Sequence, residues 1–139
     1  PMHGYYLEDL SVGMSAVFGK TVTEADIMAF AGVSGDTNPI HLHADFAKAS
    51  RFGERIAHGM LSASFISTVV GTRLPGPGSI YVSQSLNFKA PVKIGDTVTA
   101  RCEIVEIVPD RKRIKLKTEC LCGDKVVLDD VSLHIERGD

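Results

Sequence analysis

The chain has 139 residues, 44% of them hydrophobic, and its 15 basic and 17 acidic residues give a formal net charge of -2. This length suits one domain with its own core, so we expect a single domain over residues 1–139, with residues 1–3 outside the functional fold. The near-neutral charge disfavours sequence-independent binding to nucleic acid or to an anionic membrane. No apolar run approaches the roughly 20 residues of a membrane span, and we expect a soluble cytoplasmic protein.

The first third of the chain is predicted to form one short strand followed by short helices. The strand is predicted over residues 15–22, and Thr23 can cap a helix whose first turn is acidic. Gly35 can end that helix in a left-handed conformation. Residues 36–41 then read as a loop, and another short helix is predicted over residues 44–50.

Residues 60–74 form an almost uniformly apolar or small segment without a charge before Arg73. A helix without a charged side is usually buried all round, so this segment is predicted to be the central helix of the domain. Two prolines and two glycines within residues 75–78 end it.

The second half alternates between apolar and polar residues, which is typical of strands. Strands are predicted over residues 79–89, 97–108, 113–122 and 126–135, and the short connections favour antiparallel pairing. The sequence therefore predicts the α+β class, with one antiparallel sheet wrapped around the central helix. The three cysteines lack zinc-like spacing and are expected to be small buried residues. They are Cys102, Cys120 and Cys122.

The candidate site begins at Asp36 and His41, which frame the motif Asp-Thr-Asn-Pro-Ile-His. A carboxylate and an imidazole together can hold one water molecule and act as general base and general acid. Pro39 restricts its own φ and the conformation of the residue before it, which limits the movement of both side chains. His41 and His43 also form a His-x-His pair, but no second cluster supplies further metal ligands, so we expect no metal site.

The motif from Phe30 to His41, the later Ala-His-Gly-Met-Leu at residues 57–61 and the Phe-Lys-Ala-Pro-Val at residues 88–92 together resemble the MaoC-like (R)-specific enoyl-CoA hydratases. The resemblance extends over residues 10–135 and implies the hot-dog fold. It also implies addition of water to a trans-2-enoyl-CoA, giving the (R)-3-hydroxyacyl-CoA without a cofactor. Asp36 and His41 would be the catalytic pair, with Asn38 and Ser67 in support.

The same reaction needs fixed donors for the thioester oxygen, and the backbone N–H of Gly59 at the start of the central helix is the expected oxyanion donor. His58 is expected to donate to a local carbonyl and shape the turn before the helix. The apolar side chains of the helix are candidates for the acyl pocket. They are Phe65, Ile66, Val69 and Val70.

The resemblance further implies a homodimer, and two pathway roles fit this chemistry equally: polyhydroxyalkanoate precursor supply and fatty-acid oxidation. Two alternative functions stay open, a hot-dog acyl-CoA thioesterase and a non-catalytic acyl-CoA-binding subunit; metal-dependent hydrolysis is a distant third. The central helix carries no Asp or Glu, which disfavours hydrolysis. Cations for the CoA phosphates cannot be ranked from the sequence. They are Lys48, Arg51, Arg55, Arg73, Lys89 and Lys93.

Overall fold

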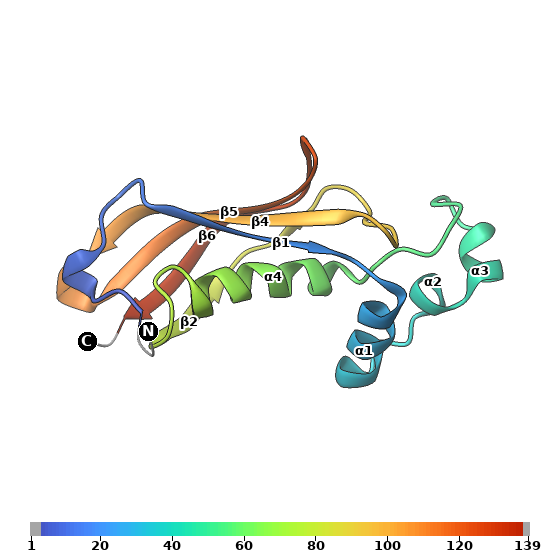
Figure 1. The fold of residues 1–139 in the computed structure, drawn as a ribbon, viewed down its shortest axis with the longest axis horizontal. Helices are drawn as coiled ribbons and strands as arrows, with labels where there is room; N and C mark the ends of the chain where they lie inside the picture. The colour runs from blue at the N-terminus through green and yellow to red at the C-terminus, as the bar shows by residue number, and fades with distance from the viewer. Residues whose placement is uncertain (1–3, 138–139) are drawn as a thin grey trace.

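A computed structural model describes residues 4–137, so residues 1–3 lie outside the described part of the chain. One antiparallel sheet dominates it, with strands in the order β1-β4-β5-β6-β2 and a short β3 paired to β6. Figure 1 shows the sheet as one long layer. Its strands are β1 (Ser15–Thr21), β2 (Ser79–Gln84), β3 (Asn87–Phe88), β4 (Thr97–Val108), β5 (Arg113–Cys122) and β6 (Lys125–Arg137).

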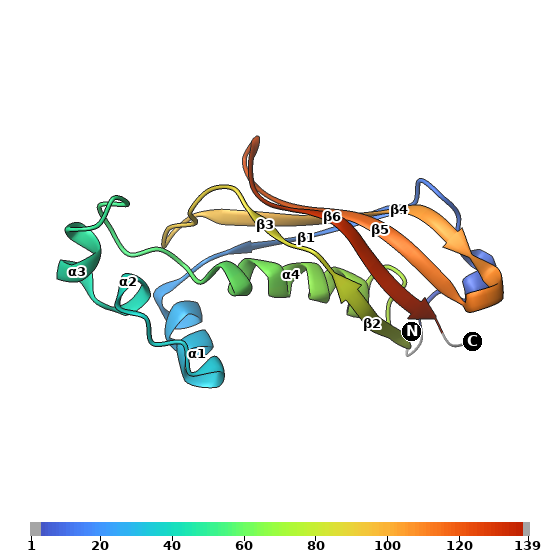
Figure 2. The ribbon, with the colours of Figure 1, turned by 180° about the vertical axis from the view of Figure 1, so that it is seen from behind.

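The long helix α4 (Gly59–Thr72) runs lengthwise under this sheet and contacts five of its strands (Figures 1 and 2). The shorter helices α1 (Glu24–Ser34), α2 (Pro39–Leu42) and α3 (Ala44–Lys48) project beyond one end of the sheet. Two 3-10 turns complete the fold, η1 (Leu7–Asp9) and η2 (Pro109–Arg111). The predicted α+β architecture, with an antiparallel sheet around a long helix, is confirmed.

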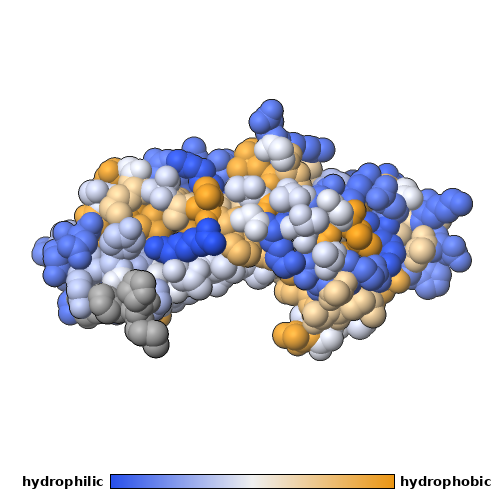
Figure 3. Space-filling view, viewed as in Figure 1, coloured by the Kyte–Doolittle hydropathy of each residue, from blue (hydrophilic) through white to orange (hydrophobic). Residues whose placement is uncertain are grey.

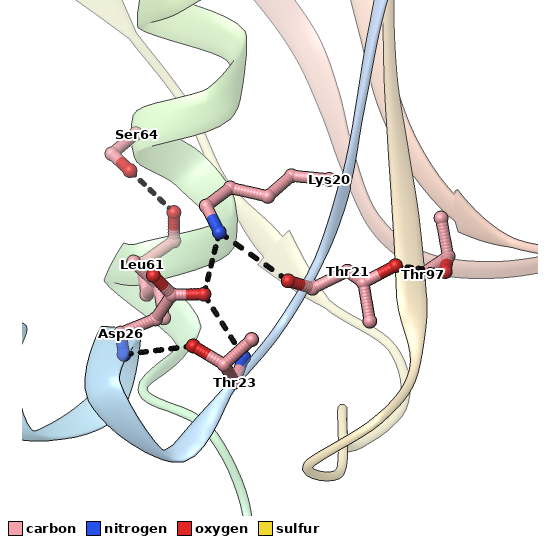
Figure 4. A network of polar contacts seen from close by, with 7 residues as sticks. All are labelled: Lys20, Thr21, Thr23, Asp26, Leu61, Ser64 and Thr97. Carbon is pink, nitrogen blue, oxygen red and sulfur yellow. Dashed lines mark hydrogen bonds and ion pairs between the residues drawn. The ribbon is translucent and has the colours of Figure 1, made fainter.

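Helix α1 begins at a reciprocal cap that also joins it to strand β1. The Asp26 amide donates to the Thr23 hydroxyl at 3.2 Å, and the Thr23 amide donates to the Asp26 carboxylate at 2.9 Å. Lys20 at the end of β1 donates to the same carboxylate at 2.6 Å (Figure 4). The cap therefore fixes the direction in which the chain leaves the sheet and enters the projecting helices.

The fold differs from the sequence prediction at residues 79–89, which form two strands rather than one. The break falls at Ser85, whose amide and hydroxyl both donate to the buried Asp130 carboxylate, at 3.2 and 2.7 Å. Thr118 donates to the other oxygen of that carboxylate at 3.2 Å. A buried carboxylate needs such partners, and these turn the chain away from regular ladder pairing.

The sequence predicted that helix α4 is buried on every side. In the single chain, one side of the helix is exposed instead. Leu61, Phe65 and Ile66 are packed in the core, whereas Met60, Ser64 and Ser67 are exposed. The space-filling view shows a recess on this side, between the body and the projecting lobe (Figure 3). Small and hydroxyl side chains leave this face uncharged, which explains why pattern alone suggested full burial. Within residues 4–137, every helix is too short or too polar to cross a membrane.

Candidate active site

The loop that carries Asp36 is held by short-range hydrogen bonds. Gly35 ends helix α1 with φ 78°, a conformation that favours glycine. The Asp36 amide then donates to the Ser34 hydroxyl at 3.1 Å, and the Asp36 carboxylate accepts from the Asn38 amide at 3.2 Å. The carboxylate is therefore exposed but oriented.

The sequence predicted a loop over residues 36–41. The second half of this prediction is wrong, because residues 39–42 form helix α2. Pro39 occupies the first turn, where its missing N–H costs nothing. The Asn38 side chain caps the helix by accepting from the Ile40 amide at 3.2 Å. Asn38 thus contacts both the Asp36 loop and the helix that carries His41.

His41 is 8% exposed, and its Nδ1 lies 2.8 Å from the Ile56 carbonyl. A carbonyl oxygen only accepts, so Nδ1 carries the proton and Nε2 keeps a lone pair. Arg55 donates from Nε to the His41 carbonyl at 2.7 Å, which also fixes the backbone. The imidazole therefore presents an acceptor to the site.

A cavity of about 410 Å³ brings Asp36 and His41 together with the start of helix α4. Gly59 is the first residue of that helix, so its amide N–H has no acceptor within the helix. Most of the remaining lining of the cavity is apolar. This apolar lining includes Phe88, Ala90, Val92, Val127 and Leu128.

Three candidate metal ligands meet at this cavity: Asp36, His41 and His58, with one ligand atom of each within 4.8 Å of the other two. His43, the residue weighed from the sequence, is not among them and instead accepts from the Phe46 amide at 3.0 Å. The His41 and His58 rings are stacked, with centroids 3.9 Å apart and planes inclined by 27°. Lone pairs in nearly parallel ring planes do not converge on one point, which disfavours a shared tetrahedral ion.

The other predicted site residues lie away from this cavity. Ser67 is exposed on helix α4 and interacts with Tyr81 of strand β2. Phe65, Ile66, Val69 and Val70 are at most 5% exposed in the core and do not line the cavity. Their predicted part in an acyl pocket therefore stays a prediction.

The cysteines do not belong to the lining of the cavity. All three are free, and burial raises the pKa of the Cys102 and Cys120 thiols to about 12. The expectation of buried, unpaired cysteines is confirmed for these two, while Cys122 is half-buried.

Sequence reasoning missed several residues around the cavity. Arg51 and Lys89 were two among six unranked cations, and the cavity places both on its lining. Phe88 belongs to the motif at residues 88–92 but had no assigned role, and it lies against Gly59. His58 donates to a carbonyl as expected, but the acceptor is Asp36, 22 residues earlier. Short-range pattern could not reveal these contacts.

Comparison with known proteins shows that the chain belongs to the MaoC like domain family, whose profile matches residues 11–122. It is 56% identical over 125 residues to an (R)-specific enoyl-CoA hydratase of Rhodospirillum rubrum, covering 90% of this chain and 87% of that protein. It is 51% identical over 128 residues to a 3-hydroxybutyryl-CoA dehydratase of Methylorubrum extorquens, covering 92% and 82% of the two chains.

Among solved structures, an (R)-hydratase of Aeromonas caviae involved in PHA biosynthesis superimposes with a TM-score of 0.89 and 39% sequence identity. The match covers 93% of this chain and 98% of that one. The predicted family membership and the hot-dog fold are confirmed.

Proposed function

We propose that this protein is an (R)-specific enoyl-CoA hydratase, which adds water to trans-2-enoyl-CoA and gives (R)-3-hydroxyacyl-CoA. One observation carries the proposal: the Asp36 carboxylate and the His41 imidazole line the same cavity as the first residue of helix α4. The hydratase and dehydratase relatives support the same reaction, because dehydration is its reverse.

The tautomer of His41 determines how water is held. Because Nε2 of His41 lacks a proton, both it and the Asp36 carboxylate are acceptors, and each can take one hydrogen of the same water molecule. The water oxygen is then free to attack C3 of the enoyl group. One of the two acceptors removes a proton from the water as the C–O bond forms, and this proton passes to C2.

Negative charge collects on the thioester oxygen during the attack. The Gly59 N–H is a donor fixed by the helix, and the helix dipole also favours negative charge there. These groups need no metal or other cofactor. We therefore expect hydration to survive prolonged treatment with a chelator, which would exclude metal-dependent hydrolysis.

The CoA part of the substrate is proposed to leave the cavity past Arg51 and Lys89. Both side chains line it and are exposed, and Arg51 lies over the Phe52 ring at 4.8 Å. In contrast, Arg55 and Lys93 form ion pairs with Glu24 and Glu54. A cation without a carboxylate partner is the better contact for a phosphate.

A homodimer is part of this proposal. Strand β2 is an edge strand with exposed Ile80, Tyr81 and Val82. Tyr81 interacts with Ser67 on the exposed face of helix α4. An edge of this kind favours pairing with a second chain. Sedimentation equilibrium would test it, and a monomer at micromolar concentration would contradict it.

We also propose a cytoplasmic location, since free cysteines suit a reducing compartment. There the product could supply polyhydroxyalkanoate synthesis or take part in fatty-acid oxidation. Acyl-chain length is the remaining question. If Val70 borders the acyl chain, Val70→Ala should extend the accepted substrates from C4 towards C8 enoyl-CoAs, whereas unchanged selectivity would contradict that role.

The decisive experiment follows the loss of enoyl absorbance with crotonyl-CoA, with chiral analysis of the product. Hydration to the (R) alcohol supports the proposal. Release of free CoA thiol without hydration would instead indicate a thioesterase, which the lack of Asp or Glu on helix α4 disfavours. Tight binding of crotonyl-CoA without turnover would indicate a non-catalytic subunit.

A further inference from the structure

His58 joins the two halves of the proposed site. It is the N-cap residue of helix α4, directly before Gly59. Its Nε2 lies 2.9 Å from the backbone carbonyl of Asp36. Because a carbonyl only accepts, His58 carries its proton on Nε2, the opposite assignment to His41.

The His58 ring is also held from the side of the projecting helices. It stacks on His41 at 3.9 Å between centroids and contacts Phe30 of helix α1 at 4.8 Å. The side chain is 1% exposed. One ring therefore contacts helix α1, helix α2 and the Asp36 backbone, while its own backbone starts helix α4.

We propose that His58 is a positioning residue, which sets the Asp36 carboxylate and the His41 ring relative to the Gly59 N–H through its Nε2–H hydrogen bond and its ring stack. The inference rests on the proposed hydratase function and names a residue on which that same site depends.

The position of Asp36 has few other anchors. Its side chain is exposed and accepts from the Asn38 amide within its own loop, and its amide donates to Ser34. Both partners belong to the same short stretch of chain. The His58 hydrogen bond spans 22 residues and ties this stretch to helix α4. A displacement of about 1 Å at a reacting group can cost on the order of 100-fold in rate.

The environment of the other ring nitrogen of His58, Nδ1, argues that the residue is not there for stability alone. Nδ1 of His58 is buried and has no hydrogen-bond partner among residues 4–137. A buried acceptor without a partner destabilises a fold, so a hydrocarbon ring would suit this position better if stability alone mattered. His58→Phe should accordingly keep the stack and the fold but lose the bond to Asp36.

The test compares His58→Phe with His58→Gln, whose amide can still donate to the Asp36 carbonyl. We expect His58→Phe to lower kcat by about 30-fold or more with KM changed less than threefold, because Phe keeps a flat ring of similar size where His58 lines the cavity. His58→Gln should retain at least five times the kcat of His58→Phe. His43 supplies matched controls, since it also caps a helix but is exposed and outside the cavity. His43→Phe and His43→Gln should have the wild-type kcat.

Several results would overturn the proposal. The proposal is wrong if a folded His58→Phe protein retains more than half of the wild-type kcat. It is also wrong if His58→Phe and His58→Gln have equal kcat. Thermal unfolding identifies a variant that has not folded. For that case, long-range ¹H–¹⁵N spectra of the wild-type protein provide an independent test: His58 should be the Nε2–H tautomer and His41 the Nδ1–H tautomer. A His58 proton on Nδ1 would contradict the hydrogen bond on which the proposal depends.

The two levels of inference fail separately. Wild-type protein that does not hydrate crotonyl-CoA would refute the hydratase function, whatever the tautomers are. An active wild type with any of the contrary results above would refute only the role of His58.

Discussion

The ring of Phe88 lies so close to Gly59 that a Cβ added to the glycine would be 2.5 Å from the nearest ring carbon. Phe88 is 55% exposed and lines the cavity, so its ring borders the start of helix α4 on the side of the cavity. The absence of a side chain at residue 59 therefore has a steric cause. It lets the aromatic ring approach the backbone N–H that we propose as the donor to the thioester oxygen.

Gly59→Ala is expected to lower kcat/KM by about 10-fold or more, although the backbone N–H is retained, because the methyl group displaces Phe88 and the substrate. Adding Phe88→Ala should restore part of the loss if the clash is with the ring. Gly71→Ala is the control, since a Cβ there meets nothing within 4 Å. Steady-state kinetics with crotonyl-CoA measures all three, and no loss in Gly59→Ala would contradict the close approach.

Asp36→Asn should reduce hydration by about 100-fold or more, the usual contribution of a general base. Its fold should persist, because the side chain is exposed and an amide oxygen can still accept from the Asn38 amide. Asp45→Asn removes an equivalent charge from an exposed residue outside the cavity and should leave the rate of hydration unchanged. Binding of crotonyl-CoA by calorimetry should be nearly unchanged in Asp36→Asn. Retained turnover would remove Asp36 from the chemistry.

Arg51→Ala and Lys89→Ala should each raise KM for crotonyl-CoA several-fold with little change in kcat, since both cations line the cavity and, in the proposed binding mode, contact CoA phosphates rather than the reacting atoms. The increase should diminish at high salt, where such attractions are screened. Lys48→Ala, an exposed cation of helix α3 that does not line the cavity, is the control. Equal effects in all three variants would point to net charge rather than to a site.

The cap of helix α1 predicts an acid-sensitive contribution to stability. Hydrogen bonds from Lys20 and from the Thr23 amide hold the pKa of Asp26 below its ordinary value. This contribution is present above the unfolded pKa of about 3.9 and is lost as the pH falls through the lower folded pKa. Asp26→Ala should cost about 1 kcal/mol at pH 7, the usual value of a helix cap.

Denaturant unfolding at pH 7 and near pH 3 would measure this. The difference between wild type and Asp26→Ala should shrink at the lower pH, because protonation of Asp26 weakens its hydrogen bonds. A difference that is independent of pH would show that the cap acts through packing. Asp9→Ala is a suitable control, because Asp9 is an exposed acid in the 3-10 turn η1.

The sequence was sufficient where local pattern governs structure. Alternation on strand β5 predicts one shared face for five residues, of which four are buried and Cys122 is half-buried. The buried four are Ile114, Leu116, Thr118 and Cys120. Thr23 and Gly35 marked both ends of helix α1, since capping and left-handed termination depend on neighbouring residues. The motif of the candidate site was recognisable for the same reason, because Asp36, Asn38 and His41 are close in the chain.

Contacts across the chain were decided by the tertiary structure. Ser85 interrupts a strand pattern because its partner is Asp130, 45 residues away. His58 was expected to bond locally, but it donates to Asp36, and Phe88 reaches Gly59 only through the pairing of strand β3 with β6.

The sequence by itself therefore determined the α+β class, the long helix and the residues able to perform acid–base chemistry, since hydrophobic period and motif are local properties. Only the tertiary structure decided which ring nitrogen of His41 and of His58 carries the proton, which cations line the cavity and which side chain lies against Gly59. Those properties depend on hydrogen-bond partners and packing between segments that are distant in the chain.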